Sequence, residues 1–278
     1  MVTSTRLIGI GLAGATCLAF SCAAFPAARA ATLTEQAPQS RRSPPPPSRS
    51  PAPPGERSAE GDYARGLAYL NGDGVAQNAE LAATWLRKAA EHGHARAQND
   101  LAVLFEAGQG VPQDFAMAVW WWRKAADQGL ADAQNFLAVM YDNGTGVPVD
   151  RREALAWYRR AAEQNHAAAQ NNLGLMYEIG RGVSLDYDEA LKWYRRAADQ
   201  GWAAAHANLG LAYVGGVGVA VDLIEGDRWL RSAVQLSSGD EQARYDSLRD
   251  TLEQTMSADD VVEAWQRARA WLIAFQRR

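Results

Sequence analysis

The sequence predicts an all-α fold in which five helical hairpins stack side by side as a solenoid. The main observation is internal: from residue 59 to residue 236 the chain aligns with itself at a spacing of 36 residues, without gaps. Within each copy, apolar residues recur at helical spacing, and two glycines separated by one residue indicate a turn between two helices. A single hairpin cannot bury its own apolar stripe, so the copies are expected to bury it by stacking.

Five columns of equivalent residues define the repeat. One column is aromatic, two are glycine, one is tryptophan and one is alanine. In that order the columns are Tyr69, Phe105, Tyr141, Tyr177 and Tyr213; Gly72, Gly108, Gly144, Gly180 and Gly216; Gly74, Gly110, Gly146, Gly182 and Gly218; Trp85, Trp121, Trp157, Trp193 and Trp229; and Ala89, Ala125, Ala161, Ala197 and Ala233.

Residues 1–30 have the features of an export signal. Arg6 precedes an apolar run over residues 7–25, and the segment ends in Ala28-Arg29-Ala30, which has the small-x-small pattern of a cleavage site. We therefore expect a periplasmic or secreted protein with no membrane span once the leader is removed. Two alternatives stay open: an uncleaved leader that anchors the chain in the membrane, and lipidation at Cys22.

Residues 31–58 are predicted to be a disordered, proline-rich linker. Prolines remove backbone donors and favour the polyproline II conformation, and few apolar side chains are present to offset the entropy of ordering. A spacer is favoured over a ligand for a proline-binding domain. Both cysteines, Cys17 and Cys22, lie in the leader, so the mature chain is expected to have no disulfide and no thiol chemistry.

Composition and charge exclude several classes of protein. The 278 residues are 47% hydrophobic and 22% charged, which excludes a collagen-like, wholly disordered or multi-span membrane protein. The net charge is −4, and because residues 1–58 carry +4, residues 59–278 carry −8. Nucleic-acid binding needs a clustered excess of Lys and Arg, so no nucleic-acid partner is predicted.

The second helix of each copy has the clearer signals. Asp150 and Glu153 form a capping box, and Asp186 with Glu189 repeats it. An apolar face follows at the spacing i, i+3, i+4 and i+7; its residues are Ala154, Trp157, Tyr158 and Ala161. Left-handed residues are expected to end these helices, and they are Gly93, Gly129, Asn165 and Gly201.

The first helix of each copy is expected to begin at the alanine of an Ala-Gln-Asn motif and to run to the glycine turn. These alanines are Ala97, Ala133 and Ala169. The paired helices resemble stacks of the tetratricopeptide kind, and this resemblance implies that the first helices line a concave face. Three copies place an amide, an aliphatic residue and a carboxylate at i, i+4 and i+7; they are Asn99, Val103, Glu106, Asn135, Val139, Asp142, Asn171, Leu175 and Glu178.

These nine residues suggest a groove in which asparagine amides bind a peptide backbone and carboxylates attract a partner's Lys or Arg. The alternative, that the asparagines bond locally and the acids are merely solvated, has equal weight. Trp120 is a further candidate, because the other copies have small or polar residues at its position. Its side chain is expected to be either an exposed contact anchor or a partly buried packing residue.

The repeat pattern resembles the Sel-one-like repeat family, a relative of the tetratricopeptide repeat. The resemblance covers roughly residues 61–236 and is closest in residues 173–201. It implies a right-handed α-α superhelix whose usual role is to bind other proteins, often in the bacterial envelope. Some bacterial members carry a disulfide in each repeat and have been linked with binding or degrading penicillins, whereas the repeats of this chain contain no cysteine.

After the last repeat, residues 237–278 are predicted to form a C-terminal helical cap. One helix is expected at about residues 240–255, and Ser257 with Asp260 opens another. The second helix has apolar residues at steps of 4, 3, 4 and 3, namely Val261, Trp265, Ala268, Leu272 and Phe275. A helix that seals the last repeat is favoured, and a helix that docks a partner is the alternative.

No catalytic residue, metal site or cofactor is predicted. The four histidines are His92, His94, His166 and His206. His94 and His166 occupy the same repeat position and are expected to be solvated or to cap helices rather than to bind metal. The expected function is therefore an exported, non-enzymatic scaffold for protein or peptide partners, with unknown oligomeric state. The alternatives are an envelope enzyme acting on β-lactams or peptidoglycan, and a cell-wall-binding module.

Overall fold

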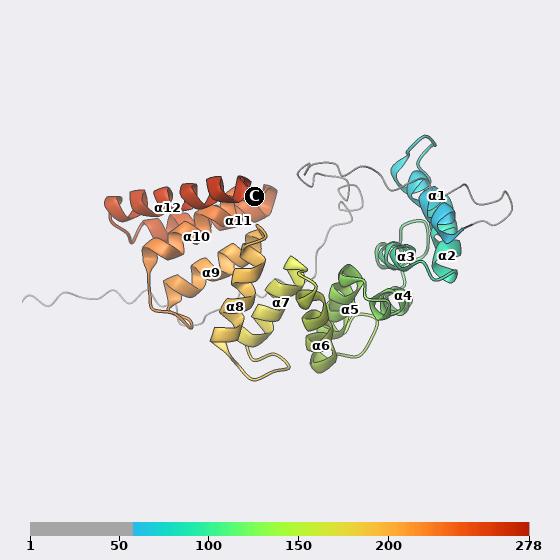
Figure 1. Ribbon diagram of the computed structural model, residues 1–278, viewed down its shortest axis with the longest axis horizontal. Helices are drawn as coiled ribbons and strands as arrows, with labels where there is room; N and C mark the ends of the chain where they lie inside the picture. The colour runs from blue at the N-terminus through green and yellow to red at the C-terminus, as the bar shows by residue number, and fades with distance from the viewer. Residues whose placement is uncertain (1–57, 278) are drawn as a thin grey trace, which may run out of the picture. The chain divides into compact units, whose positions relative to one another are not determined.

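The computed structural model describes residues 58–277, and they divide into two compact units that we treat separately. We call residues 58–185 the N-terminal unit and residues 186–277 the C-terminal unit. The expected export leader and almost all of the expected linker lie outside the described residues. Within residues 58–277 all regular structure is helical (Figure 1), which confirms the predicted all-α, tetratricopeptide-like solenoid with C-terminal capping helices.

The described residues form twelve helices joined by turns. The N-terminal unit contains α1 (Ala59–Asn71), α2 (Ala79–Glu91), α3 (Ala95–Ala107), α4 (Phe115–Asp127), α5 (Ala131–Asn143), α6 (Arg151–Glu163) and α7 (Ala167–Glu178). The C-terminal unit contains α8 (Tyr187–Ala198), α9 (Ala203–Gly215), α10 (Leu223–Gln235), α11 (Gly239–Glu253) and α12 (Ala258–Gln276). In the N-terminal unit each odd-numbered helix up to α5 packs on the next helix as a hairpin, and successive hairpins also pack together.

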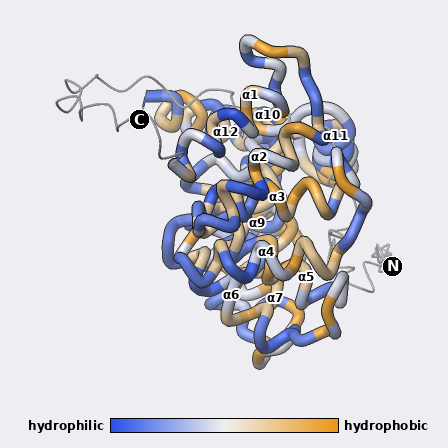
Figure 2. The backbone as a smooth tube through the Cα atoms, turned by 90° about the vertical axis from the view of Figure 1, so that its right-hand side faces the viewer, coloured by the Kyte–Doolittle hydropathy of each residue, from blue (hydrophilic) through white to orange (hydrophobic). Residues whose placement is uncertain are grey.

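The core is built from alanine and leucine columns that let the helices approach closely. The leucine column of the first helices, Leu101, Leu137, Leu173 and Leu209, is fully buried, as are the alanines of the fifth column. Hydrophobic and hydrophilic stretches follow one another along the helices (Figure 2), as is typical of helices with one apolar stripe. The tryptophan column lies in the core at Trp121, Trp157 and Trp229, and is half-buried at its two other positions.

The predicted helix caps are present. The Asp150 side chain accepts hydrogen bonds from the backbone N–H groups of Arg152 and Glu153, and Asp186 and Asp222 cap α8 and α10 in the same way. The expected left-handed residues have positive φ angles, including Asn165 at 66°. The first helices begin at Ala95, Ala131 and Ala167, two residues before the approximate starts predicted from the Ala-Gln-Asn motif.

The second glycine of the turn lies against the preceding hairpin at Gly110 and Gly146, whereas a Cβ at Gly74, in the first copy, would meet nothing within 4 Å. Gly110 has a φ of +71°, and a Cβ atom placed there would lie 2.1 Å from the carbonyl oxygen of Ala79 at the start of α2. At Gly146 a Cβ would lie 2.5 Å from the backbone of Phe115 at the start of α4. Glycine is therefore required both by the backbone angle and by the close approach of the preceding hairpin.

The C-terminal unit ends in two helices, α11 and α12, that both pack against α10. The predicted start at Ser257 is correct, because its hydroxyl accepts a hydrogen bond from the N–H of Asp260. Tyr245 of α11 is fully buried in a cluster with Leu230 and Val234 of α10. None of the helices in residues 58–277 is both long and apolar enough to span a membrane.

Candidate functional site

The nine predicted groove residues occupy equivalent positions on α3, α5 and α7 of the N-terminal unit. Side chains join these first helices directly. Tyr63 of α1 donates a hydrogen bond to Asp100 of α3 at 3.0 Å, and Asn172 of α7 donates one to Asn135 of α5 at 3.3 Å. These bonds join α1 to α3 and α5 to α7, and we call the side of α3, α5 and α7 that bears the nine residues the first-helix face.

The asparagines of this face are buried. Asn99, Asn135 and Asn171 are only 7–8% exposed. The Asn99 amide donates to Asp100 Oδ1 at 3.1 Å, and Asn135 Oδ1 accepts from Asn172. These bonds at Asn99 and Asn135 are local, as the alternative expects, whereas Asn99 Oδ1 is buried without a hydrogen-bond partner among the described residues. Binding of a peptide elsewhere on the face stays a prediction.

The carboxylates of the face differ from copy to copy. Asp142 pairs with the guanidinium of Arg181, whose Nε lies 2.8 Å from Oδ1, and Arg181 Nη2 also donates to the Asp142 carbonyl at 3.1 Å. Glu106 is half-buried, and burial raises the pKa of its carboxyl. No cation pairs with Glu106 among residues 58–277, because the position equivalent to Arg181 is Thr145 in the preceding copy.

The aliphatic members of the set lie one turn before these acids on the same helices. Val103 and Leu175 are half-buried, whereas Val139 is buried at 9% exposure. Glu178 is half-buried and has an interaction partner within the structure. The accessible part of the predicted set therefore consists of Glu106 with the neighbouring aliphatic side chains, which is narrower than the sequence suggested.

Two polar features of this unit were missed by the sequence reasoning. The first is Asp100, a mostly buried carboxyl whose pKa burial raises and which accepts hydrogen bonds from Tyr63 and Asn99. Its position has Phe136 and Asn172 in the next two copies, so no column could reveal it.

The second missed feature is a glutamine column inside the Ala-Gln-Asn motif. The side-chain amides of Gln98, Gln134 and Gln170 donate to carbonyl oxygens eight residues earlier, at 3.0–3.2 Å, in the last turn of the preceding second helix. Each of these carbonyls also accepts a hydrogen bond from the backbone N–H three residues later, at Gly93, Gly129 and Asn165, so the glutamine amide is a second donor at the helix end. Gln128 and Gln164 extend the pattern by donating to Gln98 and Gln134 at 2.7 and 2.8 Å. The motif was the available signal, and its role is to lock each hairpin to the next.

The two equivalent histidines cap helices, as predicted. His94 Nδ1 accepts from the N–H of Ala97, and its Nε2 lies 3.0 Å from Glu60 of the preceding hairpin. His166 makes the same pair of bonds, to Ala169 and Asp132. The His166 hydrogen bond lowers the pKa of Asp132. Within residues 58–277 no cluster of three His, Cys, Asp or Glu side chains could hold a metal ion.

Trp120 lies on the surface of α4. Its side chain is 47% exposed, its ring meets the Trp121 ring edge-on at 4.4 Å, and Lys124 Nζ lies 4.4 Å from its centre. Trp122, by contrast, is fully buried and stacks on Phe136. Trp120 is thus accessible to a partner, and its role as a contact anchor stays a prediction.

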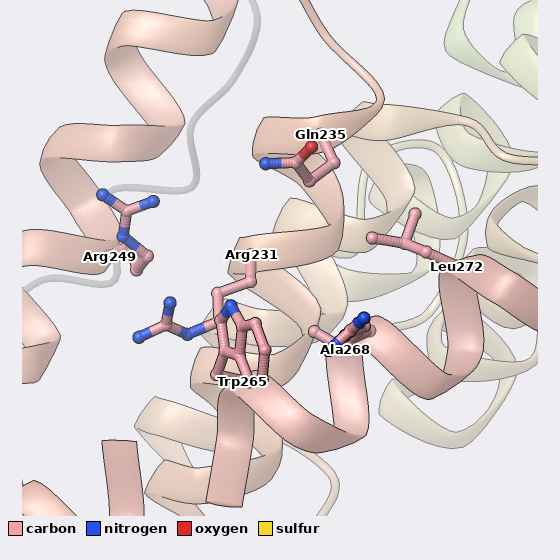
Figure 3. A pocket seen from close by; sticks show the side chains of 7 residues that line it. Arg231, Gln235, Arg249, Trp265, Ala268 and Leu272 are labelled. Carbon is pink, nitrogen blue, oxygen red and sulfur yellow. The ribbon is translucent and has the colours of Figure 1, made fainter. Parts of the chain in front are cut away.

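The C-terminal unit contains a pocket of about 260 Å³ between α10, α11 and α12 (Figure 3). It arises because α11 and α12 pack on α10 without filling the space between them. Its lining residues are Arg231, Gln235, Arg249, Trp265, Ala268, Arg269 and Leu272. They include no hydroxyl, thiol, imidazole or carboxyl group that could act as a nucleophile or a base.

Two of the pocket arginines are part of an ion network. Arg231 bonds Asp227 at 2.8 Å and Glu253 at 2.7 Å, and Arg249 bonds the same Glu253 at 3.0 Å. Asp227 is fully buried at a position where the earlier copies have apolar residues, and burial raises the pKa of its carboxyl. The network joins α10 to α11, so these arginines have a structural role at the end of the repeats.

Comparison with known proteins agrees with this geometry. The sequence model of the Sel1 repeat matches residues 59–94, 95–130, 131–166, 167–202 and 203–238. A solved Sel1 repeat protein from Oxalobacter formigenes is 30% identical, with a TM-score of 0.68 over 76% of this chain and 83% of that one.

The structure of c5321, a protective antigen of uropathogenic Escherichia coli with an SLR fold, is 29% identical, with a TM-score of 0.63 over 77% of this chain. The matched region spans 54% of that antigen. No match was found among proteins with curated descriptions. Five consecutive repeat matches cover well over half of the sequence, and the chain therefore belongs to the Sel1 repeat family.

Proposed function

We propose that this Sel1 repeat protein is a non-catalytic scaffold of the cell envelope that binds a protein or peptide partner through the first-helix face of the N-terminal unit. Repeats of this family form scaffolds that generally mediate protein–protein interaction. The finer part of the proposal is the chemistry of the partner, which presents a Lys or Arg side chain to Glu106.

The main support for this proposal is the difference between Asp142 and Glu106. At Asp142 the chain supplies its own guanidinium from Arg181, which binds both the carboxylate and the backbone carbonyl. Glu106 occupies the same repeat position, is half-buried, and has no cation among the described residues. A partly desolvated carboxylate gains from a cation that a partner brings, because a charge-assisted hydrogen bond contributes about 1.5–3 kcal/mol.

Two further observations support the proposal. Residues 59–278 carry a net charge of −8, which favours encounter with basic partners. Val103 lies one turn from Glu106 on α3 and is half-buried, so an apolar contact is available beside the carboxylate. Location in the envelope rests on the leader pattern of residues 1–30 and on the family resemblance.

The test of partner binding uses a photo-crosslinking amino acid at position 103 in cells, with the crosslinked protein identified by mass spectrometry. The matched control carries the same amino acid at Leu81 of α2, which is 40% exposed. The identified partner is then titrated calorimetrically against the purified wild type, Glu106→Gln and the control Glu80→Gln, whose side chain is exposed in the first turn of α2.

We expect Glu106→Gln to weaken binding about tenfold, as loss of about 1.4 kcal/mol implies, and Glu80→Gln to leave it unchanged. Equal affinity of Glu106→Gln and wild type would overturn the proposal. Envelope location is tested separately by fractionating cells and sequencing the N-terminus of the mature protein. A cytoplasmic protein that retains residues 1–30 would refute that part.

A further inference from the structure

The outer face of α12 is unusual for the end of a solenoid. The inner face packs on the unit: Ala264 and Ala268 are buried, and the Trp271 ring lies 4.5 Å from the His206 ring. The opposite side exposes Val262 by 54% and Ile273 by 39%. Terminal elements of repeat proteins normally present a polar outer surface. α12 lies at the edge of the C-terminal unit (Figure 1), and the exposure of Val262 and Ile273 shows that this side is left open.

Charge is distributed unevenly along the same helix. The first turn of α12 contains Asp259 and Asp260, and its last residues are followed by Arg277. Glu263 and Arg267, nearer the middle, form an ion pair within the helix. Asp259 and Arg277 have no ion pair among residues 58–277, so each end of α12 presents an uncompensated charge of opposite sign.

Helical geometry places these features on one stripe. At 100° per residue, Asp259, Val262, Gln266, Ile273 and Arg277 fall within about 60° of one another around the helix axis. Along the helix the stripe runs acidic, apolar, polar, apolar and basic. If a second copy of the stripe is placed antiparallel to the first, each charged residue lies opposite a residue of opposite charge, and each apolar residue lies opposite an apolar one.

We propose that this stripe is a self-association surface, through which two copies of the chain pair with their α12 helices antiparallel. A two-fold interface requires a patch that is complementary to itself, and the stripe has this property. With the axis near residue 268, Asp259 of each copy lies opposite Arg277 of the other. The same register brings Val262 of each copy close to Ile273 of the other, so this apolar contact occurs twice in the dimer.

The expected dimer is weak and depends on concentration. The 19 residues of α12 span about 28 Å, and one helix pair of this length buries less than the roughly 1,600 Å² of a typical stable interface. We therefore expect dissociation at micromolar or higher concentrations. The inference is independent of the first-helix face, because it concerns a different unit and a different partner.

The test is sedimentation velocity and multi-angle light scattering of the purified protein from about 1 to about 300 µM. We expect the average mass to rise toward that of a dimer over this range. Ile273→Asp should give a monomer throughout. The control Val221→Asp, at a residue that is 63% exposed and precedes α10, should behave as wild type. Circular dichroism establishes that each variant is folded.

A charge exchange tests the antiparallel register. Asp259→Arg alone should weaken association about tenfold, and combination with Arg277→Asp should restore it. A wild-type monomer at all concentrations, a dimer that survives Ile273→Asp, or an exchange without recovery would each overturn the proposal.

Discussion

His206 couples the stability of the C-terminal unit to pH. Its ring is fully buried, and Nε2 donates a hydrogen bond to the carbonyl of Ala198 at 3.0 Å. The rings of Trp229 and Trp271 lie 5.0 and 4.5 Å away, both nearly edge-on. Burial in these aromatic surroundings lowers the pKa of His206 from 6.5 to about 4, and the charge of Arg228 acts in the same direction.

The direction of the pH effect follows from proton binding. In the unfolded chain the imidazole takes up a proton as pH falls through about 6.5, whereas in the folded protein it does so only near pH 4. Between these values the unfolded state binds more protons, so the folded state loses stability as pH falls. At about 1.4 kcal/mol per pKa unit, the loss between pH 7 and pH 4 is about 3 kcal/mol.

The repeat itself supplies the control variant. The equivalent residues in the three preceding copies are glutamines whose amides make the same hydrogen bond to the preceding helix. His206→Gln is therefore expected to keep the hydrogen bond to the Ala198 carbonyl while removing the titrating imidazole. Free energies of unfolding are measured by urea denaturation at pH 7 and pH 4 for both proteins.

All other titrating groups are common to the two proteins, so their contributions cancel in the comparison. The wild type should lose about 3 kcal/mol more than His206→Gln between the two pH values. If both proteins lost the same free energy of unfolding between pH 7 and pH 4, His206 would not be buried in its neutral form, and the reasoning would be refuted.

Two further substitutions test the packing of the N-terminal unit. Trp157→Ala should lower the free energy of unfolding by about 3–5 kcal/mol, because Trp157 is only 5% exposed, and a small change in urea denaturation would contradict its place in the core. Gly110→Ala should cost more than Gly129→Ala by about 2 kcal/mol or more. Both glycines have positive φ, but only at Gly110 would the new Cβ meet the backbone of Ala79; equal melting temperatures of the two variants would argue against that contact.

The features predicted correctly from the sequence are those that recur in register. The hairpins, the capping aspartates such as Asp150, the left-handed Asn165 and the buried Trp157 all belong to columns or short motifs. Each depends on local geometry, in which a residue satisfies backbone groups only a few positions away. Because the same local arrangement recurs in every copy, it could be recognised from the sequence.

The candidate site was predicted less well. Helical spacing correctly placed Asn99 and Glu106 on one side of α3, but it could not show that the Asn99 amide is buried and bonded to Asp100. It also could not separate Glu106 from Asp142, whose guanidinium comes from Arg181, 39 positions later in the chain. Burial and pairing depend on neighbouring hairpins, and spacing within one helix does not report on them.

The amino-acid pattern was thus sufficient for the repeat unit, its five copies and its caps, because these follow from interactions within about one hairpin. Three-dimensional packing was needed to show which carboxylates lack a cation, that Gln98 and its equivalents join successive hairpins, and that one side of α12 is left uncovered. Those properties arise only when separate hairpins come together, because desolvation and ion pairing are set by everything that surrounds a side chain.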